Sequence, residues 1–173
     1  MSTIAENIAA IRARIDAAAR TTGRTGADIT LVAATKMNDA ARVREAVAAG
    51  IDACGENRVQ EMIEKMPELP ENVRWHMIGR LQKNKVKYII GKTGLIHSLC
   101  SLEVAAEIER LSAKHGVQTD CLVQINIGRE ESKAGIAEEE LPASFRSNVM
   151  RQIMLESAKA KKRDERFSLL AAI

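Results

Sequence analysis

Aromatic side chains are scarce in this sequence. They account for 2% of its 173 residues, with one Trp, one Tyr and two Phe. Proteins that hold single-stranded nucleic acid stack its bases on aromatic rings, so this composition argues against a nucleic-acid partner. No apolar run is long enough to span a bilayer, and residues 1–20 interleave charges with Ala and Ile instead of forming a hydrophobic signal core. We therefore expect a cytoplasmic protein with no membrane contact.

Cysteine is also rare. Cys54, Cys100 and Cys121 are an odd number of widely spaced thiols in a chain with no export signal, so we expect them to be reduced and buried. No two of them have metal-ligand spacing, and the three histidines do not complete a site, so no metal is expected. The sequence also lacks a Gly-rich phosphate loop, a metalloprotease motif and a nucleophile elbow.

What remains has the composition of an ordinary soluble domain, with 46% hydrophobic residues, 28% charged residues and a net charge of +3. Helical periodicity and capping signals predict helices over residues 4–21, from 38 or 39 to Gly50, over 59–66 and 82–90, and from Ser101 onward. Between them, strands are predicted at residues 29–34, 53–54, 73–78, 95–97 and 121–127.

This alternation of strands and helices predicts an α/β fold with a parallel sheet. A doubly wound sheet and a (β/α)₈ TIM-type barrel both begin in this way, and the periodicity does not separate them. The chain is shorter than the about 200 to 250 residues that such a barrel needs.

Ligands of parallel α/β folds bind at the carboxyl ends of the strands. The residues expected at those five ends are Thr35-Lys36, Glu56-Asn57, His76 with Gly79, Ser98, and Asn126. Lys36 directly follows an apolar strand, where partial desolvation would make its amine a nucleophile toward carbonyls; alternatively, it extends from the strand end into water. Asn57 and His76 could orient a ligand ring, or equally cap a helix or satisfy buried backbone groups.

Two basic clusters have plain alternatives. Arg80, Lys83, Lys85 and Lys87 could attract an anion or form the solvated face of a helix. The basic run at residues 159–163 is diluted by Glu156, Asp164 and Glu165, so we expect no nucleic-acid binding there.

Six segments together resemble the pyridoxal phosphate homeostasis protein family, whose members are single-domain relatives of the barrel half of alanine racemases. The segments occur in order at residues 31–36 (LVAATK), 55–61 (GENRVQE), 75–85 (WHMIGRLQKNK), 96–98 (IHS), 124–127 (QINI) and 131–135 (ESKAG). The resemblance covers roughly residues 1 to 142.

The resemblance implies a (β/α)₈ barrel that holds pyridoxal 5′-phosphate as a Schiff base. Lys36 matches the family's Schiff-base lysine, Asn57 matches the asparagine that lines the cofactor, and His76 belongs to the Trp-His motif of the third strand. Family members lack the second racemase domain and its catalytic base, so the resemblance implies a monomeric carrier or regulator of the cofactor, with no catalytic residue assigned. A pyridoxal-phosphate enzyme acting on amino acids is the alternative.

The sequence departs from the family after Pro142. The Ser-Met-Gly-Met-Ser and Arg-Val-Gly motifs that cradle the phosphate are absent, and residues 146–173 carry seven basic and three acidic side chains without Gly or Pro. We therefore expect a partial barrel of about five βα units over residues 1–145 and a divergent basic helical tail over 146–173. A truncated or frame-disrupted product, or a variant with a replaced C-terminus, would explain this. Its exposed barrel edges would favour self-association, and an interaction-only fragment without the phosphate site is a further alternative.

Overall fold

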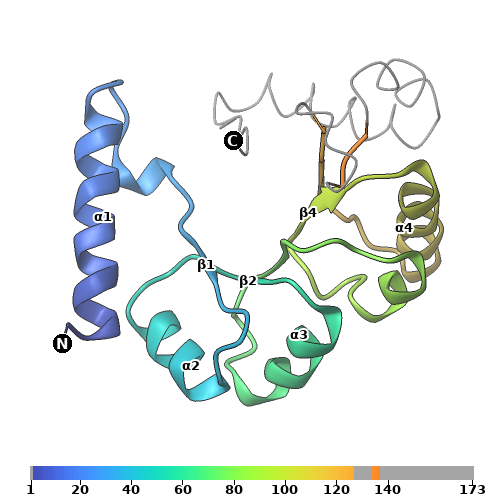
Figure 1. Ribbon diagram of the computed structural model, residues 1–173, viewed down its shortest axis with the longest axis horizontal. Coiled ribbons are helices and arrows are strands. Elements are labelled where there is room, and N and C mark those ends of the chain that lie inside the picture. Colours follow the sequence, from blue (N-terminus) through green and yellow to red (C-terminus); the bar gives the residue numbers. More distant parts are fainter. Residues whose placement is uncertain (1, 127–133, 137–173) are drawn as a thin grey trace.

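Five parallel strands lie side by side in the same order as in the sequence. The computed structural model describes residues 2–126 and 134–136 (Figure 1). The strands are β1 (Val32–Ala34), β2 (Ala53–Glu56), β3 (Trp75–Met77), β4 (Leu95–Leu99) and β5 (Cys121–Val123). Each pairs in parallel with the next, in the order β1-β2-β3-β4-β5. Figure 1 shows the sheet curving into an arc with α2, α3 and α4 on its outer side.

This strand order separates the two folds that the periodicity left open. A doubly wound sheet reverses its strand order at a switch point and carries helices on both faces, whereas a barrel adds strands in sequence with the helices outside. The fold is therefore an incomplete barrel of the (β/α) type within the described residues.

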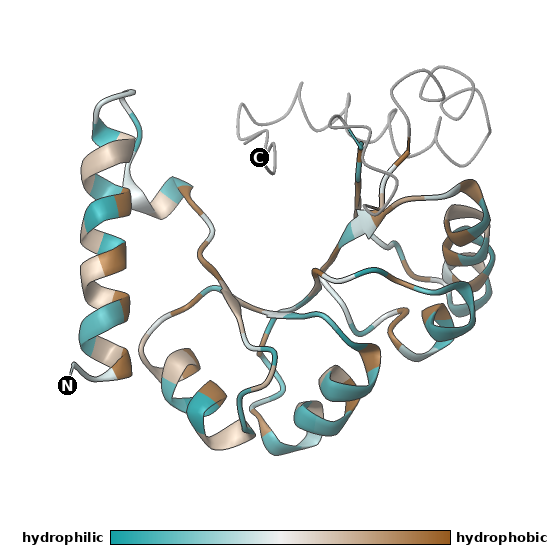
Figure 2. Ribbon diagram, in the orientation of Figure 1, coloured by the Kyte–Doolittle hydropathy of each residue, from teal (hydrophilic) through white to brown (hydrophobic). Residues whose placement is uncertain are grey.

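Among the described α-helices, α1, α2 and α4 begin at side-chain caps. The described helices are α1 (Ile4–Arg20), α2 (Ala40–Ala48), α3 (Val59–Lys65) and α4 (Leu102–His115). Thr3 and Glu6 form the predicted capping box, while the side chains of Asp39 and Ser101 accept hydrogen bonds from the first turns of α2 and α4. Figure 2 shows hydrophilic and hydrophobic bands on each helix, as in amphipathic helices.

One predicted helix takes a different form. Residues 82–90 were expected to be an α-helix, but the chain forms a 3₁₀ helix over Lys83–Tyr88. The lysines of this segment occur at every second position and cannot gather on one α-helical face. The tighter helix aligns residues three apart, which buries Val86 and Ile89 together.

The main core lies between the outer face of the sheet and the helices. Cys54, Trp75 and Met77 of the strands pack there with Met62 of α3 and Ile108 of α4, and all five are buried. Of the three cysteines, Cys54 is buried as expected, whereas Cys100 and Cys121 are partly exposed; all three are free thiols. Desolvation raises the pKa of the Cys54 thiol to about 11 and that of Cys121 to about 12, so both stay protonated and unreactive at neutral pH.

No helix in the described part of the chain is long and apolar enough to cross a membrane. The helical tail predicted over residues 146–173 lies outside the described residues.

The outer edge of β1 suggests a test of self-association. Leu31 and Thr35 bond to β2, so in a parallel ladder Val32 and Ala34 direct their N–H and C=O groups to the other side. Among the described residues no strand pairs with that side. Such an edge is a template for another chain.

We expect multimers of the 19.0-kDa chain in light scattering after size exclusion, and fewer of them in Ala34→Pro, which lacks the edge N–H. Ala34→Val keeps that N–H and is the control. A wild-type monomer that melts cooperatively would contradict this expectation.

Candidate functional site

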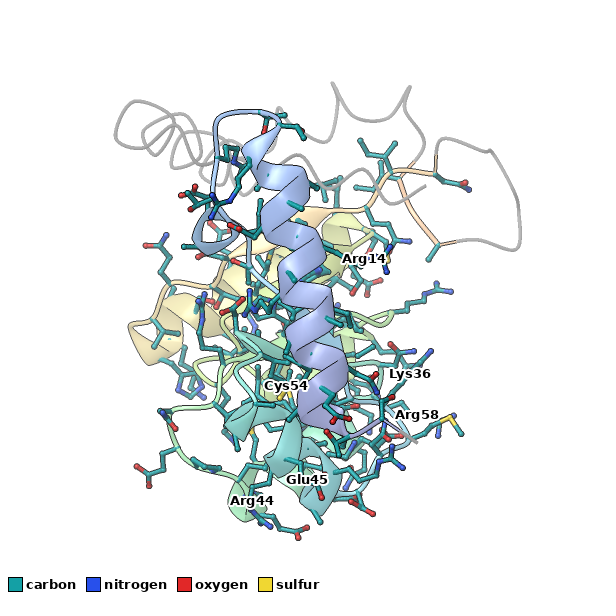
Figure 3. The ribbon with its side chains drawn as sticks, turned by 90° about the vertical axis from the view of Figure 1, so that its left-hand side faces the viewer. Arg14, Lys36, Arg44, Glu45, Cys54 and Arg58 are labelled. Carbon is teal, nitrogen blue, oxygen red and sulfur yellow. The ribbon has the colours of Figure 1, made fainter. Side chains whose placement is uncertain are left out.

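Lys36 and Asn57 lie at the carboxyl edge of the sheet. β1 and β2 are in register with Ala34 opposite Gly55, and continuing that register by two residues places Lys36 opposite Asn57. Both residues are exposed. Within the described residues, the Lys36 amine has no hydrogen bond or ion pair. In Figure 3, Lys36 and Arg58 lie on the same side of the molecule, while Cys54 is inside it. The carboxyl edge of the sheet therefore presents an exposed primary amine opposite a carboxamide.

Gly79 closes the next part of this edge. A Cβ atom at Gly79 would lie 2.3 Å from the carbonyl oxygen of Asn57 and 2.6 Å from its Cα, so the backbone that follows β3 packs directly on the backbone that follows β2. The Ser98 hydroxyl of β4 donates a hydrogen bond to the Gly79 carbonyl. The ends of β2, β3 and β4 are thereby joined around Asn57.

A buried ion pair lies beneath the edge, on the helical side of the sheet. Lys65 of α3 places its Nζ 2.7 Å from Oε1 of Glu56, which is fully buried at the end of β2. The same carboxylate oxygen accepts a 2.7 Å hydrogen bond from the Thr35 hydroxyl. Glu56 was expected at a strand end, whereas Lys65 was not predicted as part of the site, because a lysine that ends a short helix is ordinarily solvated. The spacing of Lys65 from Glu61, one helical turn, was the available signal.

His76 lies inside β3 and not at its end. Its ring is 3% exposed, and its Nδ1 is 3.0 Å from Nε2 of His97. Nε2 of His76 is buried and has no hydrogen-bond partner among the described residues. Burial, and then the neighbouring His97 and Arg74, lower the pKa of His76 to about 4, and burial also lowers the pKa of His97. Both rings are neutral at pH 7, and a contact between His76 and a cofactor remains a prediction.

The fifth strand end continues beyond β5. Ile125 forms a parallel bridge with Ile136, and the amide of Asn126 donates to the carbonyl of Ile136 at 3.0 Å. Gln124 donates through its side chain to the Ala134 carbonyl at 3.0 Å. The predicted site residue Asn126 is thus tied to the segment 134–136 that follows it in the structure.

The basic cluster after β3 does not converge on one point. Lys83 pairs with Glu103 of α4 at 2.9 Å, whereas the amines of Lys85 and Lys87 lie 5.7 and 5.0 Å from the ring centre of Tyr88. The Lys83 pair joins the 3₁₀ helix to α4, whereas the contacts of Lys85 and Lys87 stay within the 3₁₀ helix. Among the described residues, no three His, Cys, Asp or Glu side chains gather as metal ligands.

The fold and this edge together define a class: a (β/α)-barrel-type protein with an exposed lysine after its first strand. The sequence matches the family profile of the alanine racemase N-terminal domain over residues 6–156. The chain therefore belongs to the alanine racemase N-terminal domain family.

Alignments with named relatives cover most of this chain. It is 42% identical over 144 residues to the pyridoxal phosphate homeostasis protein of Pseudomonas aeruginosa, covering 83% of this chain and 63% of the relative. It is 39% identical over 141 residues to the protein of the same name from Aquifex aeolicus, covering 81% and 62%. The chain thus spans less than two thirds of the length of these relatives.

Solved structures agree on the fold. PipY of Synechococcus elongatus, in a structure without pyridoxal phosphate, superposes with a TM-score of 0.70 at 32% identity, covering 82% of this chain and 64% of PipY. A second PipY structure, with pyridoxal phosphate bound, gives a TM-score of 0.67 at 31% identity, covering 85% and 66%.

The Gly79 contact predicts a sharp difference between two glycines. Gly79→Ala should lower the free energy of unfolding by about 1–3 kcal/mol or more, because backbone must move to admit the methyl group. Gly94→Ala is the control, since a Cβ there meets no atom closer than 3.8 Å. Urea unfolding measures both variants. Equal losses from the two substitutions would show that the Gly79 contact is not tight.

The histidine pair predicts a pH dependence of stability. Because the folded pKa of His76 is depressed from 6.5 to about 4, the unfolded chain binds protons in this range that the folded protein excludes. The melting temperature should fall as the pH is lowered through this window. His76→Gln should flatten that slope, even where its absolute stability is lower. A slope identical to wild type would mean that His76 does not titrate in this way.

Proposed function

We propose that this chain binds pyridoxal 5′-phosphate as a Schiff base on Lys36 and serves intracellular homeostasis of that cofactor. The observation that carries the proposal is the exposed Lys36 amine at the carboxyl edge of a barrel-type sheet, where it has no partner among the described residues. Relatives named as pyridoxal phosphate homeostasis proteins and a PipY structure with pyridoxal phosphate bound support it.

The residues present fit the aldehyde end of the cofactor. A Schiff base needs an accessible, unpaired primary amine, and the Lys36 amine is exposed with no partner in the part of the chain that the structure describes. Asn57 lies opposite on the neighbouring strand, where its carboxamide would line the cofactor. His76 would act from below the edge as a neutral ring, held in place by His97. When bound, pyridoxal phosphate supplies an electron sink for carbanions.

A carrier is the activity that the relatives favour over catalysis. They are named for cofactor homeostasis and not for a reaction, and we assign no catalytic residue and no metal. In this proposal the cytoplasmic chain exchanges cofactor with solution through Lys36 and needs neither a nucleic acid nor a membrane as partner. Multimers formed through the edge of β1 would leave the Lys36 amine accessible, because it lies at the strand ends.

An absorbance titration with pyridoxal 5′-phosphate tests the proposal. Wild type should show a saturable visible band from the Schiff base, and Lys36→Ala should lose it, because the band requires that amine. Lys92→Ala is the matched control: Lys92 is also exposed but lies away from the strand ends, in the loop before β4. It should bind like wild type.

Weak, unsaturable signals of equal size from wild type and Lys36→Ala would overturn the proposal. Such signals are those of scattered surface lysines that react without a formed site.

A further inference from the structure

The turn that carries Lys36 is anchored from α3 on both of its sides. Before Lys36, the Thr35 carbonyl accepts a 3.0 Å hydrogen bond from Nζ of Lys65. After Lys36, the Met37 amide donates to Oε2 of Glu61 at 3.2 Å. Nζ of Lys65 lies 3.4 Å from Oε2 of Glu61, and the two residues are one helical turn apart on α3. Two side chains of α3, Lys65 and Glu61, therefore form hydrogen bonds with the backbone on either side of Lys36.

Met37 is the part of the turn that most needs such an anchor. Its φ is +61°, and among the described residues no other non-glycine residue has a positive φ. Turns that require this conformation usually place Gly or Asn there. The Met37 side chain is 90% exposed, so packing does not hold it. The backbone amide of Asn38 closes the turn by donating a 3.2 Å hydrogen bond to the Thr35 carbonyl. Glu61 accepts the hydrogen bond from the Met37 backbone amide.

The buried Lys65 side chain fixes the position of α3 against the sheet. Lys65 bonds at the same time to Glu56 of β2 and to the Thr35 carbonyl beyond β1. Buried ion pairs contribute little net stability, because desolvation offsets their attraction. Their geometric effect is clear here, since one ammonium group joins two strand ends and a helix.

Charge on Glu61 is consistent with this arrangement. The hydrogen bond from the Met37 amide, followed by the neighbouring Glu56 and Lys65 side chains, keeps the pKa of Glu61 below its usual value. At neutral pH the carboxylate is an acceptor only, as the Met37 amide requires.

We propose that Glu61 and Lys65 are positioning residues for Lys36, which hold the turn of residues 35–38 so that the amine meets the aldehyde of pyridoxal phosphate in one orientation. The inference rests on the proposed function at Lys36. The inference adds two residues to the proposed site, Glu61 and Lys65. These residues do not touch the cofactor and act only through the backbone on either side of Lys36.

The test compares Glu61→Ala, Glu61→Gln and Glu64→Ala. Alanine removes the acceptor of the Met37 amide, whereas glutamine keeps an acceptor oxygen. Glu64 lies on the same helix and bonds only to Gln60 among the described residues, so its loss is the matched control. Each protein is treated with pyridoxal 5′-phosphate, reduced with borohydride, and the labelling of Lys36 relative to Lys92 is measured by peptide mass spectrometry.

Glu61→Ala should lower the Lys36-to-Lys92 labelling ratio about two- to tenfold, the range expected for one lost hydrogen bond. Glu61→Gln should recover most of the ratio, and Glu64→Ala should leave it unchanged. A ratio in Glu61→Ala equal to that of wild type overturns the positioning role. A wild-type ratio near one overturns the proposed function instead.

A second readout needs no cofactor. Hydrogen exchange of the Met37 amide should be faster in Glu61→Ala than in wild type, and close to wild type in Glu61→Gln and Glu64→Ala. Unchanged exchange in Glu61→Ala would show that Glu61 does not hold the turn, whatever the outcome of the labelling.

Discussion

The parallel register of β1 on β2 is the constraint on which the rest of this structure depends. It sets Thr35 beside Glu56 on the helical side and Lys36 opposite Asn57 at the open edge. A shift by one residue would exchange the two faces of β1. The Thr35 hydroxyl would then turn away from Glu56, and the only charged side chain of the turn would point toward the helices. The register is therefore also the condition for a usable amine.

The buried Glu56 carboxylate explains why this register is strongly specified. A carboxylate with no exposed surface must be compensated, and its two partners come from different elements, Thr35 after β1 and Lys65 at the end of α3. A slip of β1 against β2 would take the Thr35 hydroxyl away from Glu56 and the Thr35 carbonyl away from Lys65. Part of the energetic cost of misalignment thus falls at the strand ends where the proposed cofactor site lies.

Much of this architecture follows from local sequence rules. The Thr3–Glu6 capping box, the Asp39 and Ser101 caps and the alternation of apolar strands with amphipathic helices predicted the element order, and they placed Lys36 after a strand. The choice of barrel over doubly wound sheet needed the strand order, which depends on pairing between distant segments. Burial of Lys65 and the contact between the His76 and His97 rings were also beyond local rules. Each requires a partner from another element, nine residues away for Lys65 and 21 for His76. At Lys83–Tyr88 the apolar periodicity predicted an α-helix, but the structure has a 3₁₀ helix that buries Val86 and Ile89.

The first helix is joined to the rest of the molecule differently from the others. Only Ile8 and Ala19 of its 17 residues are buried. Its polar attachments include Arg12, which bonds to the Gly50 carbonyl at 2.8 Å and pairs with Asp52 at 2.7 Å, and Asp16, whose Oδ1 accepts a 2.8 Å hydrogen bond from the Gly26 amide. Because α1 buries so little apolar surface, we expect it to be among the segments that open locally at low free-energy cost while the sheet stays folded. The protein should therefore exist as a native ensemble in which the strand ends around Lys36 remain formed even in those molecules whose first helix is undocked.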